Sequence, residues 1–210
     1  MLVIVDYKAG NLKSVERACR EVGMEAEISG DPEKIRQASR LIFPGVGAAG
    51  AAMASLQETG IDEAIREFFN LGRPVLWICL GLQISLNYSE ENKTKTLDLI
   101  SGKVKKFRLK ETGLKIPHMG WNTVNVIQQH PVLDRIEPRD EFYFVHSYYA
   151  VPAKKESVYA LTDYEDQFAS VIAKDNLIAT QFHPEKSGRV GLRLLSNFLR
   201  WQVWCLVKEW

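Results

Sequence analysis

Short apolar runs separated by helical patterns most constrain the fold of the first hundred residues. The runs Leu2–Val5, Leu41–Phe43 and Val75–Ile78 are almost continuously apolar. Such runs are typical of strands that are covered on both faces. Glu25–Ile28 is a weaker strand candidate between the first two. Strands that alternate with helices predict an open, mostly parallel sheet with helices on both sides.

The predicted helices are amphipathic. Asn11 is positioned to cap the first of them, and the small residues Ala48–Met53 resemble the start of another. Apolar residues recur at the spacing of one helix face. These faces consist of Leu12, Val15, Cys19 and Val22 in the first helix, Ile61, Ala64, Ile65, Phe68 and Phe69 in the central one, and Gly191, Leu194, Leu195 and Phe198 in a last helix that begins near Gly188.

The second half of the chain has a different pattern, with short strands and turns but little helical periodicity. Its predicted strands are Lys103–Leu109, Thr123–Ile127, Glu141–Tyr149, Ser157–Thr162, Ala169–Ala173 and Leu177–Phe182. We therefore expect an α/β fold with an appended antiparallel or mixed β region. A chain of 210 residues can bury roughly 70% of its surface, so we expect one domain over residues 1–210, ending in a hydrophobic tail at 201–210.

Composition excludes several classes of protein. The net charge of +1 argues against a chain built mainly to bind nucleic acid. Residues 1–6 lack the basic start of a signal peptide, and no apolar run is long enough to span a membrane. The three cysteines, Cys19, Cys79 and Cys205, form no CxxC pair, which argues against a zinc ribbon and a disulfide scaffold. We expect a cytoplasmic protein.

Cys79 stands where the Val75–Ile78 strand meets a helix predicted to start near Gly81. A nucleophile at such a turn is exposed at the carboxyl edge of the sheet, where ligands of open α/β folds bind. A helix N-terminus also favours the thiolate form. An isolated cysteine is more often a small buried hydrophobe, and we interpret Cys19 and Cys205 in that way.

His183 and Glu185 form a second candidate pair, in the segment His183-Pro184-Glu185 at the end of an apolar strand. In extended chain, residues i and i+2 point to the same side, so Glu185 can orient the His183 ring as a general base. Pro184 favours extended geometry at His183. The alternative is a surface ion pair at an exposed strand end. A zinc-deaminase site is excluded because its Pro-Cys-x-x-Cys partner is missing.

The loop Pro44-Gly45-Val46-Gly47 follows the third predicted strand. Its glycines let backbone N–H groups approach a ligand, and together with the N–H of Leu80 they could form an oxyanion hole. The alternative is a plain turn. Taken together, a nucleophile, an oriented base and oxyanion donors at strand ends match a Cys–His–Glu acyl-transfer site.

These motifs resemble a known family. Cys79–Gln83 with His183–Glu185 resembles the class I (triad) glutamine amidotransferases. Within that family, four more motifs are similar to those of the glutaminase subunits of imidazole glycerol phosphate synthase, which belong to histidine biosynthesis. They are Asp6–Leu12, Pro44–Gly47, Pro117–Asn122 and Phe144–Tyr148, and the resemblance covers about residues 1–200.

The resemblance implies that Cys79 attacks the side-chain amide of glutamine, His183 moves the protons and Glu185 orients His183. Ammonia would leave, and the thioester would be hydrolysed to glutamate without a metal or cofactor. The oxyanion and substrate-binding residues implied by the resemblance are Gly45, Val46, Gly47, Leu80, Gln83, Glu91, His146, Ser147 and Tyr148.

In the family, the ammonia passes to a (β/α)₈-barrel cyclase, so the resemblance also implies a heterodimer. Residues of the motifs that face this partner are Met119, Trp121, Asn122, Tyr143 and Lys186.

The sequence departs from the family pattern at three positions. Lys8, Trp77 and Asn92 stand where glycine is usual or frequent. Two other interpretations of the chain remain open. One is a stand-alone cysteine hydrolase of the same fold, which would turn over without a partner. The other is a non-catalytic interaction subunit, which Trp77 suggests because it lies two residues before Cys79.

Overall fold

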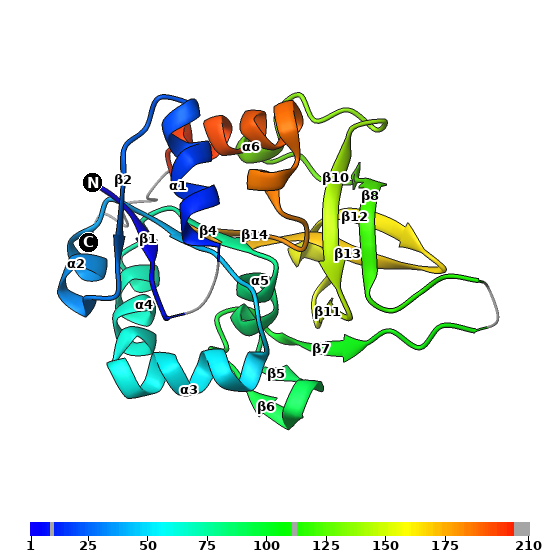
Figure 1. Cartoon of the computed structure of the whole chain (residues 1–210), viewed down its shortest axis with the longest axis horizontal. Coiled ribbons are helices and arrows are strands. Elements are labelled where there is room, and N and C mark those ends of the chain that lie inside the picture. The colour runs from blue at the N-terminus through cyan, green and yellow to red at the C-terminus, as the bar shows by residue number, and fades with distance from the viewer. Residues whose placement is uncertain (9–10, 111–112, 204–210) are drawn as a thin grey trace, which may run out of the picture.

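A twelve-stranded mixed sheet runs through the whole protein in the computed structural model, which describes residues 1–8, 11–110 and 113–203. Five adjacent strands form its parallel half (Figure 1). In spatial order these are β2 (Ala26–Ser29), β1 (Leu2–Val5), β3 (Arg40–Phe43), β4 (Val75–Ile78) and β14 (Leu177–Thr180). The predicted parallel sheet is therefore confirmed.

The sheet continues from β14 into a mostly antiparallel half. Its longer strands are β13 (Asp166–Lys174), β12 (Val158–Tyr164), β11 (Tyr148–Pro152) and β7 (Gly102–Lys106). Short strands at its margins are β5 (Tyr88–Ser89), β6 (Thr94–Lys95) and β9 (Asn125–Val126). This half is the appended β region that the sequence predicts.

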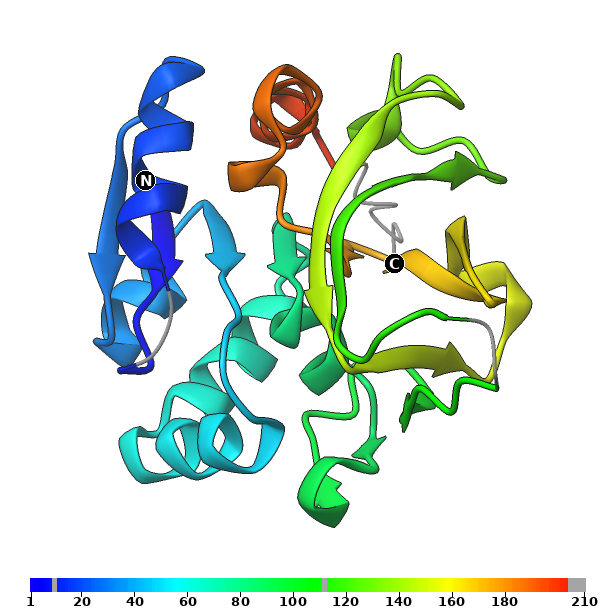
Figure 2. The ribbon, with the colours of Figure 1, turned by 45° about the vertical axis from the view of Figure 1, so that its right-hand side comes forward.

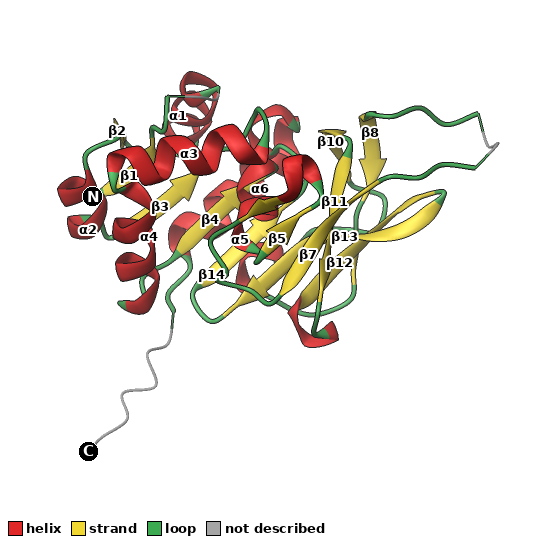
Figure 3. Cartoon of the chain, turned by 90° about the horizontal axis from the view of Figure 1, so that it is seen from below, coloured by secondary structure: helices red, strands yellow, loops and turns green. Residues whose placement is uncertain are grey.

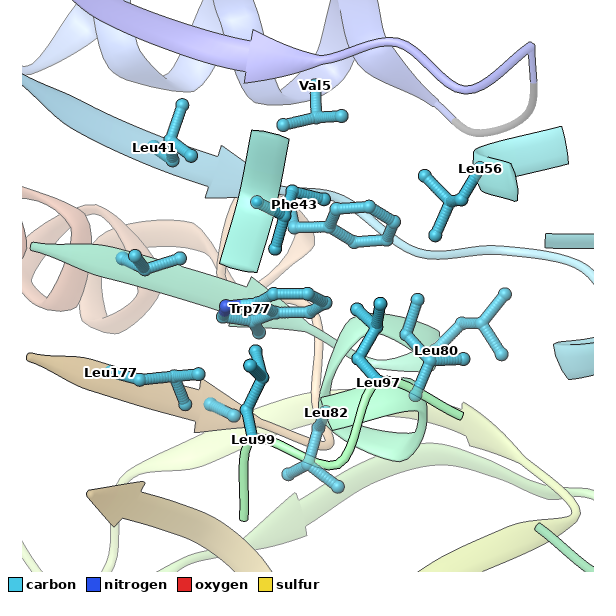
Figure 4. Close-up of a cluster of buried hydrophobic side chains, with 14 of the residues drawn as sticks. Val5, Leu41, Phe43, Leu56, Trp77, Leu80, Leu82, Leu97, Leu99 and Leu177 are labelled. Carbon is cyan, nitrogen blue, oxygen red and sulfur yellow. The ribbon is translucent and has the colours of Figure 1, made fainter. Parts of the chain in front are cut away.

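Helices cover both faces of the parallel half (Figures 1 and 2). On one face lie α1 (Leu12–Glu21) and α6 (Gly188–Arg200), and on the other α2 (Pro32–Gln37), α3 (Ala49–Thr59), α4 (Ile61–Asn70) and α5 (Leu80–Ser85). All four residues of β4 are buried. Val75 and Trp77 pack toward α2–α5, whereas Leu76 and Ile78 pack toward α1 and α6. Figure 4 shows Trp77 among its neighbours on the first of these faces. The continuous apolar run thus reflects burial on two sides.

A separate two-stranded antiparallel sheet, β8 (His118–Thr123) with β10 (Glu141–His146), lies over the antiparallel half (Figures 2 and 3). Its inward side chains Phe142 and Phe144 join the same hydrophobic cluster as Phe168 of β13. The prediction of one continuous strand over Glu141–Tyr149 is wrong, because the structure divides this range between two sheets. The chain leaves this small sheet after His146 and enters the main sheet as β11 at Tyr148.

Other elements also differ from the sequence prediction. For example, β7 ends at Lys106 and β14 at Thr180, earlier than the predicted ends at Leu109 and Phe182, whereas β13 is longer than the predicted Ala169–Ala173. The predicted strand Thr123–Ile127 is divided between the end of β8 and the short β9. The small helix α2 was not expected, because it buries only Ile35. It is fixed instead by Pro32 in its first turn and by the Asp31 carboxylate, which accepts a hydrogen bond from the Glu33 N–H at 2.9 Å.

The described end of the chain packs on the protein body. Trp201 is buried, and its carbonyl accepts a hydrogen bond from the Arg40 guanidinium at 2.6 Å. The rest of the predicted tail (204–210), Cys205, and residues 9 and 10 of the Asp6–Leu12 motif lie outside the described residues. Within the described ranges, no helix is both long and apolar enough to cross a membrane.

Candidate active site

Cys79 occupies the sharp turn between β4 and α5, with φ 52° and ψ −102°. This backbone conformation is unfavourable for a residue with a side chain, and such strain is characteristic of nucleophile turns. The turn packs directly on the loop 44–47. A Cβ atom at Gly45 would lie 2.4 Å from the Gly81 nitrogen and 2.6 Å from the Ile78 carbonyl oxygen. The glycine at position 45 is therefore required by this close approach.

His183 follows β14, the parallel neighbour of β4, so the two candidate reactive residues leave adjacent strand ends. His183 Nδ1 lies 2.8 Å from Glu185 Oε1, and both side chains are buried. His183 is extended, as predicted, with φ −102° and ψ 95°. The next residues, Pro184–Lys186, form one turn of 3₁₀ helix, so the ion pair does not arise from the extended i, i+2 geometry that we expected.

The electrostatics of this pair favour a charged imidazole. Burial lowers the pKa of His183, but the Cys79 sulfur and the Glu185 carboxylate outweigh burial and raise it to about 10. His183 Nε2 is buried and has no hydrogen-bond partner within the described protein. With its pKa raised in this way, the ring carries a proton on Nε2 and can deliver it to a leaving group as a general acid.

One pocket, with a volume of about 410 Å³, contains these groups. Its lining includes Cys79, His183 and all nine residues expected for the oxyanion and substrate, which are Gly45, Val46, Gly47, Leu80, Gln83, Glu91, His146, Ser147 and Tyr148. Glu185 contacts His183 and does not line the pocket. Within residues 1–8, 11–110 and 113–203, no group of three or more His, Cys, Asp or Glu side chains could hold a metal ion.

The pocket also contains residues that the sequence analysis did not select. Pro117 and Val145 belong to its lining. Gln181 donates a hydrogen bond to the Cys79 sulfur at 3.6 Å and accepts one from Gln83 Nε2 at 3.3 Å. Gln181 stands two residues before His183, and this spacing was the one signal that could have identified it.

Three of the predicted binding groups are already hydrogen-bonded within the protein. Gln83 Nε2 donates to the Tyr148 carbonyl at 2.9 Å. The Glu91 carboxylate accepts from the Ala49 N–H at 2.7 Å, at the N-terminus of α3. The Val46 N–H lies 3.2 Å from the Tyr7 hydroxyl, and so does the Val46 carbonyl oxygen. Burial raises the pKa of Tyr7 to about 12, so this hydroxyl keeps its proton.

The predicted partner-facing residues lie mostly on the outer side of β8 and β10. Met119 and Trp121 point outward and are 62% and 54% exposed. Tyr143 is opposite Trp121 across the two strands, with ring centroids 6.1 Å apart, and Lys186 Nζ lies 5.8 Å from the Tyr143 ring. Asn122 has the opposite orientation, because its half-buried amide donates to the Asp163 carbonyl at 2.9 Å.

The three departures from the family pattern have different structural consequences. Lys8 and Asn92 have φ values of 65° and 53°, a conformation that glycine adopts most easily. Trp77 is fully buried below the nucleophile turn and stacks on Phe43 at 4.6 Å (Figure 4). The indole therefore fills the core beside Gly81 and does not enter the pocket.

Comparison with known proteins agrees with this architecture. The sequence profile described as glutamine amidotransferase class-I matches residues 3–201. The chain is 50% identical over 208 residues to the imidazole glycerol phosphate synthase subunit HisH of Nitratidesulfovibrio vulgaris strain DP4, covering 96% of each chain. It is 48% identical over 201 residues to the subunit of the same name in Dehalococcoides mccartyi strain 195, covering 95% of this chain and 97% of the relative.

Solved structures share the fold at low sequence identity. The structure of PurLQS from Thermotoga maritima superimposes with a TM-score of 0.74 at 17% identity and covers 94% of this chain and 96% of that one. A glutamine amidotransferase, also from Thermotoga maritima, gives a TM-score of 0.61 at 14% identity, covering 94% of this chain and 81% of that one. From its sequence profile and near full-length relatives, the chain belongs to the class-I glutamine amidotransferase family.

Proposed function

We propose that this chain is the glutaminase subunit of an imidazole glycerol phosphate synthase and supplies ammonia for histidine biosynthesis. The main support is identity near 50% over almost the full length of subunits that carry this name. The pocket that combines Cys79, His183 and a buried carboxylate supports the glutaminase chemistry.

In the proposed reaction, the Cys79 thiolate attacks the side-chain amide carbon of glutamine and forms a tetrahedral oxyanion. His183, protonated by the thiol, returns that proton to the leaving nitrogen, and the C–N bond breaks to release ammonia and leave a thioester. His183 then takes a proton from water, which attacks the thioester. The C–S bond breaks, glutamate leaves, and His183 returns the proton to the Cys79 sulfur. Glu185 holds the ring through Nδ1, so that Nε2 is the nitrogen that transfers protons.

The pocket walls provide the proposed binding groups. The N–H of Leu80, at the start of α5, and the N–H groups of the 45–47 loop are the proposed oxyanion donors. The Val46 N–H would have to exchange its hydrogen bond to the Tyr7 hydroxyl for one to the oxyanion. Gln83, Glu91 and the segment 146–148 are proposed to bind glutamine. Glu91 is suited to the amino group of the substrate because it lines the pocket and its carboxylate carries the opposite charge.

The partner is proposed to be a (β/α)₈-barrel cyclase that docks on the outer face of β8 and β10. Exposed Met119 and Trp121, next to Tyr143 and Lys186, give that face the aromatic and basic character of binding surfaces. We also propose that residues 1–210 form one domain, because the main sheet is continuous through both halves. The free thiols of Cys19 and Cys79 support the proposed cytoplasmic location.

The test is the Cys79→Ala variant, assayed as a complex with the barrel cyclase. We expect glutamine-dependent synthesis to disappear, while synthesis with added ammonium salt continues because the cyclase does not need the thiol. Cys19→Ala, which removes a buried thiol that does not line the pocket, is the control and should keep both activities. Glutamine-dependent synthesis by Cys79→Ala would refute the assignment. Full glutaminase turnover by the wild-type chain alone would favour the stand-alone hydrolase.

A further inference from the structure

A chain of side-chain hydrogen bonds connects the pocket to strand β8. His146 lines the pocket, and its Nδ1 lies 2.8 Å from the Tyr148 carbonyl oxygen. His146 Nε2 lies 3.0 Å from His118 Nδ1, and His118 Nε2 lies 3.3 Å from Asn122 Nδ2. His118 and Asn122 belong to β8, whose outward residues are Met119 and Trp121.

The direction of each hydrogen bond in this network follows from the groups at its two ends, the Tyr148 carbonyl and the Asn122 amide. A carbonyl oxygen only accepts, so His146 Nδ1 must carry the proton and Nε2 must accept. His118 Nδ1 must therefore donate and His118 Nε2 accept. Asn122 satisfies that acceptor, because its oxygen accepts the Thr123 N–H at 2.8 Å and its nitrogen also donates to Asp163 O. Both imidazoles are thus neutral and protonated on Nδ1, which is the less common tautomer in free histidine.

The surroundings of the two rings keep them neutral and in place. His118 and His146 are 3% and 5% exposed. The His118 ring stacks between Tyr164 at 4.0 Å and Phe144 at 4.9 Å, and His146 lies beside Phe107 and Phe168. Burial in this aromatic cluster lowers the pKa of His118 to about 4 and that of His146 to about 3. The network is therefore a set of neutral hydrogen bonds at neutral pH.

The network ends at the backbone carbonyl of Tyr148, a residue that lines the pocket. Tyr148 O accepts hydrogen bonds from both His146 and Gln83, and Ser147 and Tyr148 form part of the pocket wall. Here the chain crosses from β10 of the small sheet to β11 of the main sheet. The side chains from His146 to Asn122 thus connect this crossing to β8.

We propose that His118 is a positioning residue for the glutamine pocket, which through its hydrogen bond to His146 holds the Ser147–Tyr148 wall in register with strand β8. The inference rests on the proposed glutaminase function and assigns His118 no part in the chemical step. It predicts that the loss of the His118–His146 bond weakens glutamine binding and leaves the Cys79–His183 pair unaffected.

The first test does not depend on activity. Ring ¹⁵N NMR of the wild-type chain, with resonances assigned through His118→Phe and His146→Phe, should show both imidazoles protonated on Nδ1 at pH 7. In His118→Phe, the resonance of His146 Nε2 should move to the position of a nitrogen that accepts no hydrogen bond. Protonation of either ring on Nε2 in the wild-type protein would overturn the proposal.

The second test separates binding from chemistry in the complex with the barrel cyclase. His118→Phe keeps an aromatic ring between Tyr164 and Phe144 but removes both ring nitrogens. From the usual strength of one hydrogen bond, we expect KM for glutamine to rise roughly three- to tenfold, with kcat changed less than about twofold. In His118→Asn, the amide can replace Nδ1 as the donor, so KM for glutamine should fall back most of the way to the wild-type value. Ile127→Ala, at an exposed residue beyond β9 and away from the outer face of β8 and β10, is the control and should behave as wild type.

An unchanged KM in a folded His118→Phe protein would refute the positioning role, and so would a loss confined to kcat. A His118→Asn protein as impaired as His118→Phe would also refute it, because restoring the hydrogen-bond donor would then not restore glutamine binding. If the wild-type complex has no glutaminase activity, the proposed function fails, while the NMR result still decides whether the network exists.

Discussion

The two halves of the sheet contribute different parts of the pocket. The parallel half is buried on both faces, and its strands β4 and β14 end directly before Cys79 and near His183. The Cys79 N–H donates to the Thr180 carbonyl at 2.7 Å, which joins these two strand ends. In the small sheet β8–β10 above the antiparallel half, buried and exposed side chains alternate. The reactive groups therefore come from a region with no free face, whereas the proposed partner surface comes from a region that has one.

The largest expected effect concerns the strained turn of the parallel half. In Cys79→Gly, glutamine hydrolysis should fall at least about a thousandfold because the nucleophile is gone. The free energy of unfolding should rise by about 1 kcal/mol, since glycine adopts φ 52° without steric strain. Paired activity and urea-denaturation measurements check this. Cys19→Ala should show the opposite pattern, with activity kept and stability lowered. A destabilised Cys79→Gly would mean that the turn stores no strain.

The second prediction compares two glycines of the same loop. Gly45→Ala should lower the free energy of unfolding by about 3 kcal/mol, because its Cβ would overlap the backbone of the nucleophile turn. Gly47→Ala should cost only about 1 kcal/mol, because position 47 has open space and only its φ of 99° disfavours alanine. Urea denaturation of both variants measures the difference. Equal losses would contradict the close packing of loop and turn.

The third prediction concerns acid stability and tests the antiparallel half. The folded pKa values of His118 and His146, about 4 and about 3, lie below the ordinary value of 6.5. The stability that these two neutral imidazoles contribute is fully present above pH 6.5. It is lost as the pH falls toward their pKa values in the folded state, by about 1.4 kcal/mol per pH unit for each residue. When the pH is lowered from 6.5 to 5, protonation of this pair should reduce the free energy of unfolding, measured by urea denaturation, by about 3 kcal/mol.

His183 does not contribute to this acid loss. Its pKa is raised to about 10, so its contribution is complete below pH 6.5 and is lost only as the pH rises toward 10. In His118→Phe the slope of stability against pH between 6.5 and 5 should fall by about a third, because His130, whose pKa burial lowers to about 4, contributes to that slope as well as His146. An unchanged slope in that variant would show that His118 is not the group that takes up the proton.

The smallest effect is expected at the exposed face of the small sheet. Trp121→Ala should weaken binding of the barrel cyclase about thirtyfold, as truncation of a central interface tryptophan often does. It should change the free energy of unfolding by less than about 0.5 kcal/mol, because Trp121 is 54% exposed. Isothermal titration calorimetry measures the binding. Ile127→Ala, at an exposed apolar residue beyond β9, is the control, and equal weakening by both would place the partner elsewhere.

Local features were predictable because they depend on a few neighbouring residues. The runs at β1, β3 and β4 are apolar because both faces of each strand are covered, so their bounds followed closely from the sequence. The strand His118–Thr123 was not recognised, because its inward positions carry His118, Gly120 and Asn122 in place of apolar residues. The Glu185 contact was expected, but the 3₁₀ turn that creates it was not.

The sequence by itself determined the alternation of strands and helices, the position of Cys79 at a strand-to-helix turn and the pairing of His183 with Glu185. Each of these is encoded in a short window by periodicity, glycine or proline. Only the tertiary structure brought His118 to His146, 28 residues apart, and Gln181 to Cys79, 102 residues apart. Such contacts depend on strand order and register, which result from the packing of the whole sheet.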